Sequence, residues 1–170
     1  MEFSELIQKR YSVRAYQNRP IVDDVLQRVL EAFALAPTAA NRQPLGLIVI
    51  KTAGRAEELK RIYSPDWFAV QPPVVVCACA LPGQAWIRRD GKNYADVDVT
   101  IAMDHLILAA TAEGLGTCWI GAFDPSAARE VLGLPEGVEP VTFTPLGYPA
   151  DSAQPKRRKR FDQLIHYEHW

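Results

Sequence analysis

The N-terminal region places three hydrogen-bonding side chains at alternate positions of one short segment. The residues from Arg10 to Arg14 read Arg-Tyr-Ser-Val-Arg. On an extended backbone, alternate side chains point to the same face, so Arg10, Ser12 and Arg14 would project together. Two guanidinium groups beside a hydroxyl form a good receptor for a phosphate and for a polarised carbonyl. The alternative is a solvated edge strand, because short charged segments are common on protein surfaces.

A second polar segment lies between two prolines, Pro37 and Pro44. It offers a hydroxyl from Thr38, amides from Asn41 and Gln43, and small alanines that add little bulk. Such a loop can present polar side chains and backbone groups to a flat heteroaromatic ligand. The alternative is a simple connection from a helix to a strand.

Five consecutive basic residues, 156–160, are followed by apolar and aromatic side chains up to Trp170. A basic run of this kind can be a nuclear-localisation signal or a nucleic-acid patch. A disordered basic arm would not need the apolar residues that follow it, and those residues require a surface to pack on. We therefore expect residues 150–170 to form an ordered tail that brings basic side chains to an anionic ligand and packs on a partner subunit.

Three aromatic residues in expected loops are candidates for shaping a substrate pocket. Trp67 and Phe68 lie in residues 64–73, and Trp86 stands alone in the polar, turn-rich residues 81–93. Loop aromatics can form a lid over a pocket or pack onto the protein's own surface. The sequence leaves both interpretations open.

The fold must hold these segments in place, and we expect the residues from Tyr94 to Gly121 to form its centre. Up to Gly114 it reads as one helix that is apolar over most of its circumference, and such a helix must be covered on several sides. One chain can wrap this helix, but a second subunit would cover it more fully. Several aspartates interrupt the apolar run, so we expect no membrane span.

Hydrophobic patterning predicts the elements around this helix. The expected helices span residues 3–9, 22–33, 55–63 and 125–132, and the expected strands span 45–50, 74–80, 117–121 and 138–146. The strands at 45–50 and 74–80 are continuous apolar runs, which predicts burial on both faces. Pro140 and Pro145 indicate that the last strand lies at an edge or contains a bulge.

Composition indicates one ordinary globular domain over residues 1–170. The chain is 48% hydrophobic and 23% charged, and its formal net charge of -1 argues against a globally basic nucleic-acid binder. Its three cysteines lie in apolar runs, which favours buried reduced thiols over disulfides, with metal binding a weak alternative. The N-terminus lacks the apolar core of an export signal. We therefore expect a cytoplasmic protein without a metal site, a nucleic-acid partner or a membrane partner.

Several catalytic motifs are absent from the sequence. No expected strand is followed by G-x-G-x-x-G, and neither a Walker A sequence nor H-E-x-x-H occurs. No serine or Cys/His arrangement supports a hydrolase triad. No catalytic side chain is predicted.

Taken in chain order, four segments and the basic tail closely resemble the flavin-dependent nitroreductase family. The segments are Arg10–Arg14, Pro37–Pro44, Gly114–Gly121 and Leu146–Pro149. No single motif is decisive, but five in this order across essentially the whole chain are not expected by chance. The resemblance implies an α+β fold with a mixed central sheet flanked by helices. It also implies an intertwined homodimer with FMN at two interfacial sites.

The resemblance assigns the phosphate of FMN to residues from both ends of the chain. Arg10, Ser12 and Arg14 match a segment whose first arginine holds the phosphate. The last residue of that segment lies near the N1/O2 side of the isoalloxazine. Lys156 and Arg158 match further phosphate ligands. The basic run would then be a phosphate clamp.

Other positions are implied to contact the flavin ring. A loop that the partner subunit donates in this family matches Pro37, Thr38, Ala39, Asn41 and Gln43. Thr38 replaces a serine there and keeps its hydroxyl. Gly121 and Ala122 match a backbone contact near flavin N5.

The implied activity is that of an NAD(P)H oxidoreductase whose chemistry belongs to FMN. In a ping-pong cycle, NAD(P)H passes hydride to flavin N5, and an electron-poor acceptor such as a nitroaromatic, quinone, enone or free flavin is then reduced. Two alternatives stay open. One is other flavin chemistry on the same scaffold, such as dehalogenation or flavin breakdown, and the other is a non-catalytic FMN-binding protein. The sequence specifies neither the acceptor nor the preferred nicotinamide.

Overall fold

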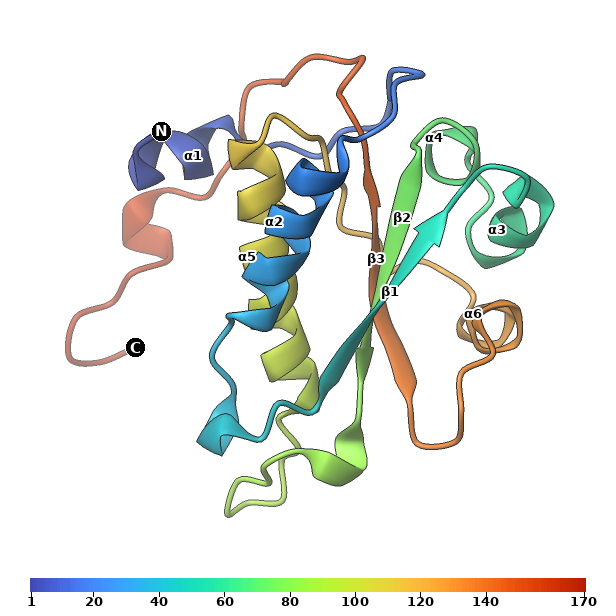
Figure 1. Ribbon diagram of the computed structural model, residues 1–170. Coiled ribbons are helices and arrows are strands. Elements are labelled where there is room, and N and C mark those ends of the chain that lie inside the picture. The colour runs from blue at the N-terminus through green and yellow to red at the C-terminus, as the bar shows by residue number, and fades with distance from the viewer.

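A computed structural model describes residues 1–170 and arranges them in three layers (Figure 1). The middle layer is a sheet in the order β1-β2-β3, with strands β1 (Leu45–Lys51), β2 (Val74–Ala80) and β3 (Glu139–Leu146). One face carries α2 (Asp23–Ala34) and α5 (Ala95–Ala112). The other face carries α3 (Ala56–Ile62), α4 (Asp66–Ala69) and α6 (Pro125–Leu132).

The remaining elements are short. Helix α1 (Phe3–Lys9) lies beside α5, and three 3-10 turns are η1 (Ala39–Asn41), η2 (Pro82–Gln84) and η3 (Phe161–Gln163). The expected helices are confirmed to within about two residues at each end, which is the usual uncertainty of helix ends. Asp124 caps α6 as its Oδ1 accepts the backbone N–H groups of Ser126 and Ala127 at 2.9 and 3.0 Å.

Strand β2 is the centre of the core, and every residue in it is buried. Its side chains alternate between two hydrophobic clusters, as a pleated strand requires. The cluster beneath α2 and α5 receives Val74, Val76, Ala78 and Ala80. The cluster beneath α3, α4 and α6 receives Val75, Cys77 and Cys79. The sulfur atoms of the two cysteines lie 3.7 Å apart. The predicted burial of this strand on both faces is confirmed.

Strand β1 corrects the corresponding prediction, because it is a half-open edge strand in this chain. Only Ile50 is buried along β1, and Val49 is 41% exposed. Leu45, Leu47 and Val49 line an open apolar groove together with residues of α2. One chain therefore leaves part of the apolar surface of β1 uncovered.

The three strands pair antiparallel, which corrects the expected mixed sheet, and the one parallel pairing lies outside these strands. Ser12 forms a parallel bridge with Thr117, and Ile120 forms an antiparallel bridge with Phe143. The expected strand at 117–121 is thus present as isolated bridges. The register of β3 shifts opposite Ala78 and Cys79, which confirms the bulge indicated by its prolines.

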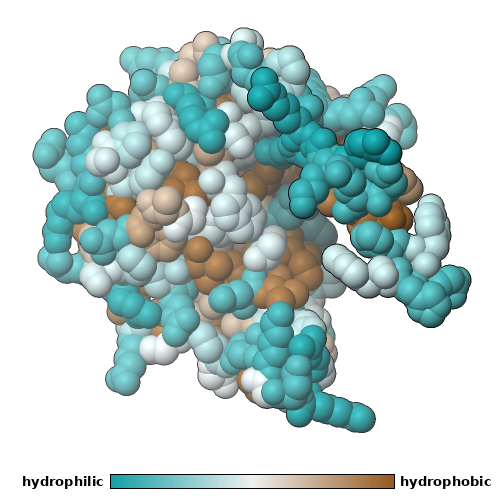
Figure 2. Space-filling view, turned by 180° about the vertical axis from the view of Figure 1, so that it is seen from behind, coloured by the Kyte–Doolittle hydropathy of each residue, from teal (hydrophilic) through white to brown (hydrophobic).

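Helix α5 is the predicted central helix, and its buried face packs on α2 and β2. Val97, Ile101 and Leu108 on another side are only half-buried. Figure 2 shows apolar surface gathered in a hollow between the main body and the C-terminal segment. No helix, α5 included, combines the length and apolar character needed to cross a membrane.

The C-terminal segment runs past α1 and ends away from the sheet (Figure 1). Residues 151–170 are all exposed. The large apolar side chains among them are Phe161, Leu164, Ile165, Tyr167 and Trp170. The chain alone offers them no packing surface.

Gly116 permits a close approach between the segment before α2 and the segment after α5. A Cβ at Gly116 would lie 2.6 Å from Cγ2 of Val13 and 2.9 Å from its Cβ. Gly116→Ala should push the two segments apart and lower the free energy of unfolding by about 1–3 kcal/mol, as overpacking does. Chemical denaturation measures the change. Gly83→Ala is the control, because a Cβ there meets nothing within 4 Å. Equal stability of the two variants would contradict this account.

Candidate functional site

Residues from both ends of the chain line a pocket of ≈ 680 Å³. This volume falls within the range of about 300–1,000 Å³ that is typical of small-molecule sites. Its polar and cationic side chains include Arg10, Ser12, Arg14, Lys156, Arg157 and Arg158. The structure thus brings together five of the residues that the sequence singled out, three from the N-terminal segment and two from the tail. We call this pocket the cationic pocket.

Positive charge is crowded in the cationic pocket. Loss of solvation by the surrounding groups, and then the charges of Arg10 and Arg158, lower the pKa of Lys156. The Lys156 ammonium donates a hydrogen bond of 2.6 Å to the carbonyl of Ile7, which anchors the tail on α1. Like charges that line one pocket repel each other, and an anion bound among them offsets this electrostatic repulsion. The pocket therefore fits a ligand that carries a phosphate or a similar anion.

Asp151 holds the base of the tail against the N-terminal segment. Its Oδ2 accepts the backbone N–H of Arg14 at 2.8 Å, and its Oδ1 accepts the hydroxyl of Tyr11 at 3.2 Å. Burial and the Asp151 charge raise the pKa of Tyr11, so this hydroxyl stays protonated and donates. Sequence analysis missed this residue, since its partners lie 137 and 140 positions away and no local spacing reveals them.

The parallel bridge between Ser12 and Thr117 sets the direction of two segments beside the pocket. Both segments run the same way from this bridge, one toward Arg14 and the other toward Gly121 and Ala122. Gly121 lies about 13 Å along an extended chain from Thr117. The N–H groups of Gly121 and Ala122 are exposed and donate to no group of the chain. They remain available as hydrogen-bond donors.

The loop at residues 37–44 has a strained backbone. Ala40, Asn41 and Gln43 have φ angles of 51°, 52° and 51°, in the left-handed region that favours glycine. Each such residue costs about 1–3 kcal/mol, and strain of this kind concentrates at functional sites. The Gln43 N–H donates to the Thr38 hydroxyl oxygen at 3.0 Å, which closes the loop on itself. Thr38 and Gln43 also border the apolar groove beside β1.

This loop and the cationic pocket lie at opposite ends of α5. The loop contacts the start of the helix, where Ala39 donates its N–H to Asp98 at 2.8 Å. Arg10 lies at the other end, where it shares a small pocket with Thr111. Thirteen residues separate Asp98 from Thr111, or about 20 Å along the axis. The predicted ligand-binding residues therefore form two half-sites that one chain does not bring together.

Comparison with known proteins identifies the family to which this chain belongs. The family model described as "Nitroreductase family" matches residues 7–78 and 68–148. The chain is a member of the nitroreductase family. The resemblance seen in the sequence is thereby confirmed.

Individual members of the nitroreductase family match nearly the whole chain. A crystal structure of a nitroreductase family protein from Clostridium difficile 630 superposes with a TM-score of 0.92 at 34% identity, covering 100% of both chains. A protein from Archaeoglobus fulgidus named "Putative NADH dehydrogenase/NAD(P)H nitroreductase" is 32% identical over 99% of both chains. The "FMN reductase [NAD(P)H]" of Bacillus subtilis is 26% identical over 92% of this chain and 70% of its own length. The α+β nitroreductase fold is thus confirmed.

The aromatic residues singled out from the sequence divide between the core and the two half-sites. Phe68 is fully buried and packs edge-on against Phe143 and Tyr63, with ring centroids 5.9 and 5.5 Å away. The structure therefore corrects its expected place in a substrate pocket. Trp67 is half-buried, and the Arg14 guanidinium lies 5.9 Å from its ring centroid, which places it beside the cationic pocket.

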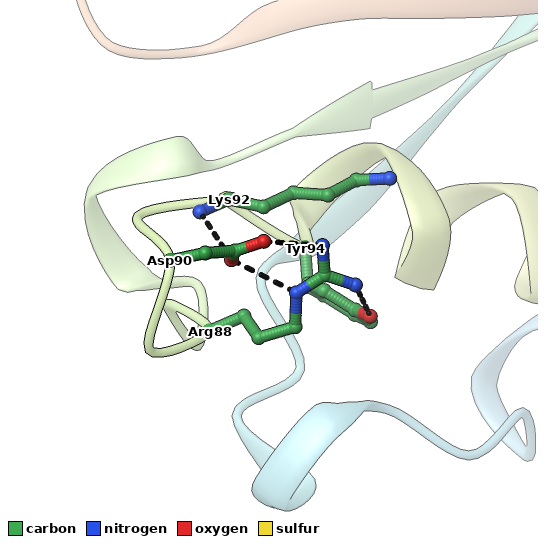
Figure 3. A network of polar contacts seen from close by, with 4 residues as sticks. All are labelled: Arg88, Asp90, Lys92 and Tyr94. Carbon is green, nitrogen blue, oxygen red and sulfur yellow. Dashed lines mark hydrogen bonds and ion pairs between the residues drawn. The ribbon is translucent and has the colours of Figure 1, made fainter.

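Trp86 lies at the base of a hairpin that leads into the start of α5, the end of the helix that the 37–44 loop contacts. Arg88 makes two bonds to the Asp90 carboxylate, at 2.8 and 2.5 Å, and a third to the Tyr94 hydroxyl at 3.1 Å (Figure 3). The Trp86 ring packs edge-on against the Tyr94 ring at 5.0 Å. This network braces the hairpin and fixes Trp86 at its base. Nowhere does the chain group three His, Cys, Asp or Glu side chains that could hold a metal ion.

Asp151→Ala should loosen the base of the tail, because it removes the carboxylate that accepts the Arg14 N–H and leaves the Tyr11 hydroxyl only the Asp151 carbonyl, at 2.9 Å. The Arg14 amide should exchange its hydrogen at least about tenfold faster, since hydrogen bonds to a charged acceptor contribute about 1.5–3 kcal/mol. Hydrogen-exchange mass spectrometry or NMR measures this rate. Asp162→Ala is the matched control, because Asp162 lies in the same tail and pairs with Arg160. Unchanged exchange at Arg14 in Asp151→Ala would refute the anchoring role.

Proposed function

We propose that this protein is an FMN-dependent NAD(P)H oxidoreductase that works as a homodimer with two sites shared between its subunits. The observation that carries the proposal is the cationic pocket, where basic groups from both ends of a nearly neutral chain converge. A pocket of crowded cations fits the phosphate end of FMN. Family membership and the names of the relatives support the same cofactor and reductant.

The phosphate end of FMN would be held by Arg10, Lys156 and Arg158. Arginine can make two parallel hydrogen bonds to a phosphate, while lysine supplies a point charge. The Ser12 hydroxyl adds a neutral donor between the two arginines. Since an anion relieves the repulsion among these cations, phosphate binding would also tie the tail to the N-terminal segment.

The ring end would lie toward Arg14, Gly121 and Ala122. FMN, when bound, supplies the chemistry of accepting a hydride from NAD(P)H and reducing an electron-poor acceptor. Arg14 would contribute positive charge near the N1/O2 side of the ring, where it stabilises developing negative charge. The free N–H groups of Gly121 and Ala122 would orient the ring as donors. No side-chain acid or base is assigned.

A second copy of the chain would supply what one chain lacks. In a symmetric dimer, the same patch on both subunits makes the interface, so each subunit gives and receives the same elements. Covering the outer side of α5 with an antiparallel copy would bring the 37–44 loop of one subunit to the cationic pocket of the other. The Thr38, Asn41 and Gln43 side chains, with the backbone of Pro37 and Ala39, would then reach the flavin. The exposed apolar residues of the tail would pack on that partner.

The acceptor would be selected by the aromatic residues around the ring, with Trp67 and Trp86 as the pocket residues. Nitroaromatics and quinones are the acceptor class we propose, in line with the family. The three free buried cysteines fit a reducing compartment, and we include a cytoplasmic location in the proposal.

The direct test is to titrate the purified protein with FMN and then add NADH or NADPH without oxygen. We expect saturable binding and loss of the yellow flavin absorbance with at least one nicotinamide. In Arg10→Ala, FMN affinity should fall about 10- to 100-fold, as expected for a lost hydrogen bond between two charged groups. Lys159→Ala is the control, because Lys159 belongs to the same basic run and does not line the pocket. Bound flavin that neither nicotinamide bleaches would support a non-catalytic FMN-binding protein instead.

The shared site predicts complementation between two defective variants. Arg10→Ala damages the cationic pocket, and Asn41→Ala damages the donated loop. After dissociation and reassociation of a mixture, mixed dimers should each contain one intact site, and about a quarter of all sites should bind FMN with wild-type affinity. Fluorescence titration of the mixture measures this fraction. If mixing restores no sites although dimers exchange, the site lies within one chain.

A further inference from the structure

Asp98 is a buried acidic residue to which sequence analysis assigned no role. It lies near the start of α5, is 1% exposed and uses its Oδ1 to accept the Ala39 N–H at 2.8 Å. Its Oδ2 is the one buried side-chain oxygen or nitrogen in the protein without a hydrogen-bond partner. A buried carboxylate is unfavourable unless hydrogen bonds compensate it, so packing alone does not account for an aspartate here. The amino end of α5, with its positive helix dipole, partly offsets this cost.

The bond from Ala39 to Asp98 is the attachment of the 37–44 loop tip to the rest of the fold. The other hydrogen bonds of residues 38–43 stay within the loop or reach only the adjoining start of β1, where Leu45 donates its N–H to the Gln43 carbonyl at 2.9 Å. Three residues just beyond Ala39 hold positive φ angles. A strained conformation persists only where the surrounding structure over-determines it. Asp98 supplies the contact from that surrounding structure.

We propose that Asp98 is a positioning residue that holds residues 38–43 in a ligand-ready conformation before FMN binds. The inference rests on the proposed function and extends it. Without this hydrogen bond, the residues with positive φ would relax to negative φ angles. Flavin binding would then have to restore the loop conformation. Ordering a loop on binding weakens affinity, whereas a preformed loop avoids that loss. In the shared site, Asp98 of one subunit would act on the flavin held by the cationic pocket of the other.

The test compares Asp98→Ala, Asp98→Asn and Asp96→Ala in the full-length protein. Asparagine keeps an oxygen that can accept the Ala39 N–H, while alanine does not. Asp96 lies on the same turn of α5 with an exposed carboxylate, so it is the matched control. Two readouts are measured: the FMN dissociation constant, and hydrogen exchange of the Ala39 amide in flavin-free protein. The second does not depend on flavin binding.

We expect Asp98→Ala to raise the exchange rate at Ala39 and the FMN dissociation constant at least about tenfold each, as for loss of a buried charge-assisted hydrogen bond. Asp98→Asn should lie between the wild type and Asp98→Ala in both readouts, because asparagine keeps an acceptor oxygen but loses the charge that strengthens the bond. Wild-type values in Asp98→Ala would overturn the proposal. A loss in Asp98→Asn equal to that in Asp98→Ala would also overturn it, because the retained acceptor would then have no effect.

A second variant removes the donor in case Asp98→Ala does not fold. Ala39→Pro lacks the N–H at the first position of a 3-10 turn, where proline fits and where Thr38 before it is already extended. On its own, Ala39→Pro should raise the FMN dissociation constant at least about tenfold, and wild-type affinity would overturn the proposal. Where Asp98→Ala does fold, the two effects should not add. Full additivity would show that the two groups do not act through one bond. If the wild type binds no FMN while Ala39 exchange still depends on Asp98, the proposed function fails but the anchor stands.

Discussion

The architecture depends on the requirement that α5, which is apolar around most of its circumference, be covered on several sides. The sheet and α2 cover two sides, and a third side remains half-exposed. The groove beside β1 and the C-terminal tail also leave apolar side chains exposed. The same helix also holds the two half-sites about 20 Å apart. In the proposed dimer, one partner subunit would therefore both cover the exposed surface and complete the divided site.

The two ends of the chain meet in the cationic pocket although both carry positive charge. The tail contributes cations to a pocket that already holds two arginines, and this repulsion opposes its ordering. Two contacts oppose the repulsion in the absence of an anion: Asp151 on the N-terminal segment, and the ammonium of Lys156 on the carbonyl of Ile7. A carboxylate within a phosphate-type pocket would seem unfavourable. Its oxygens, however, are engaged by the Arg14 N–H and the Tyr11 hydroxyl, so it acts as an anchor for the backbone.

Local patterns in the sequence were sufficient for much of the fold. The apolar run of β2, the length of α5 and the Asp124 cap were all predictable, because each follows from residues that are near in sequence. The half-open state of β1 was not, since an apolar run reports the burial of the assembled protein and not that of one chain. Phe68 looked like a loop aromatic because sequence periodicity does not show which neighbours surround a side chain. Asp98 and Asp151 act through partners distant in the chain, and no spacing rule connects them.

A divided site also changes how substrate selection can be understood. Trp67 lies beside Arg14 in one half-site, whereas Trp86 lies in the braced hairpin at the other end of α5. In the proposed dimer these two walls come from different subunits, so their separation depends on how the subunits dock. The bonds of Arg88 to Asp90 and Tyr94 connect residues within the Trp86 hairpin of one subunit. In that arrangement the docking of the two subunits would set the space left for an acceptor, and acceptor choice would be a property of the pair of chains.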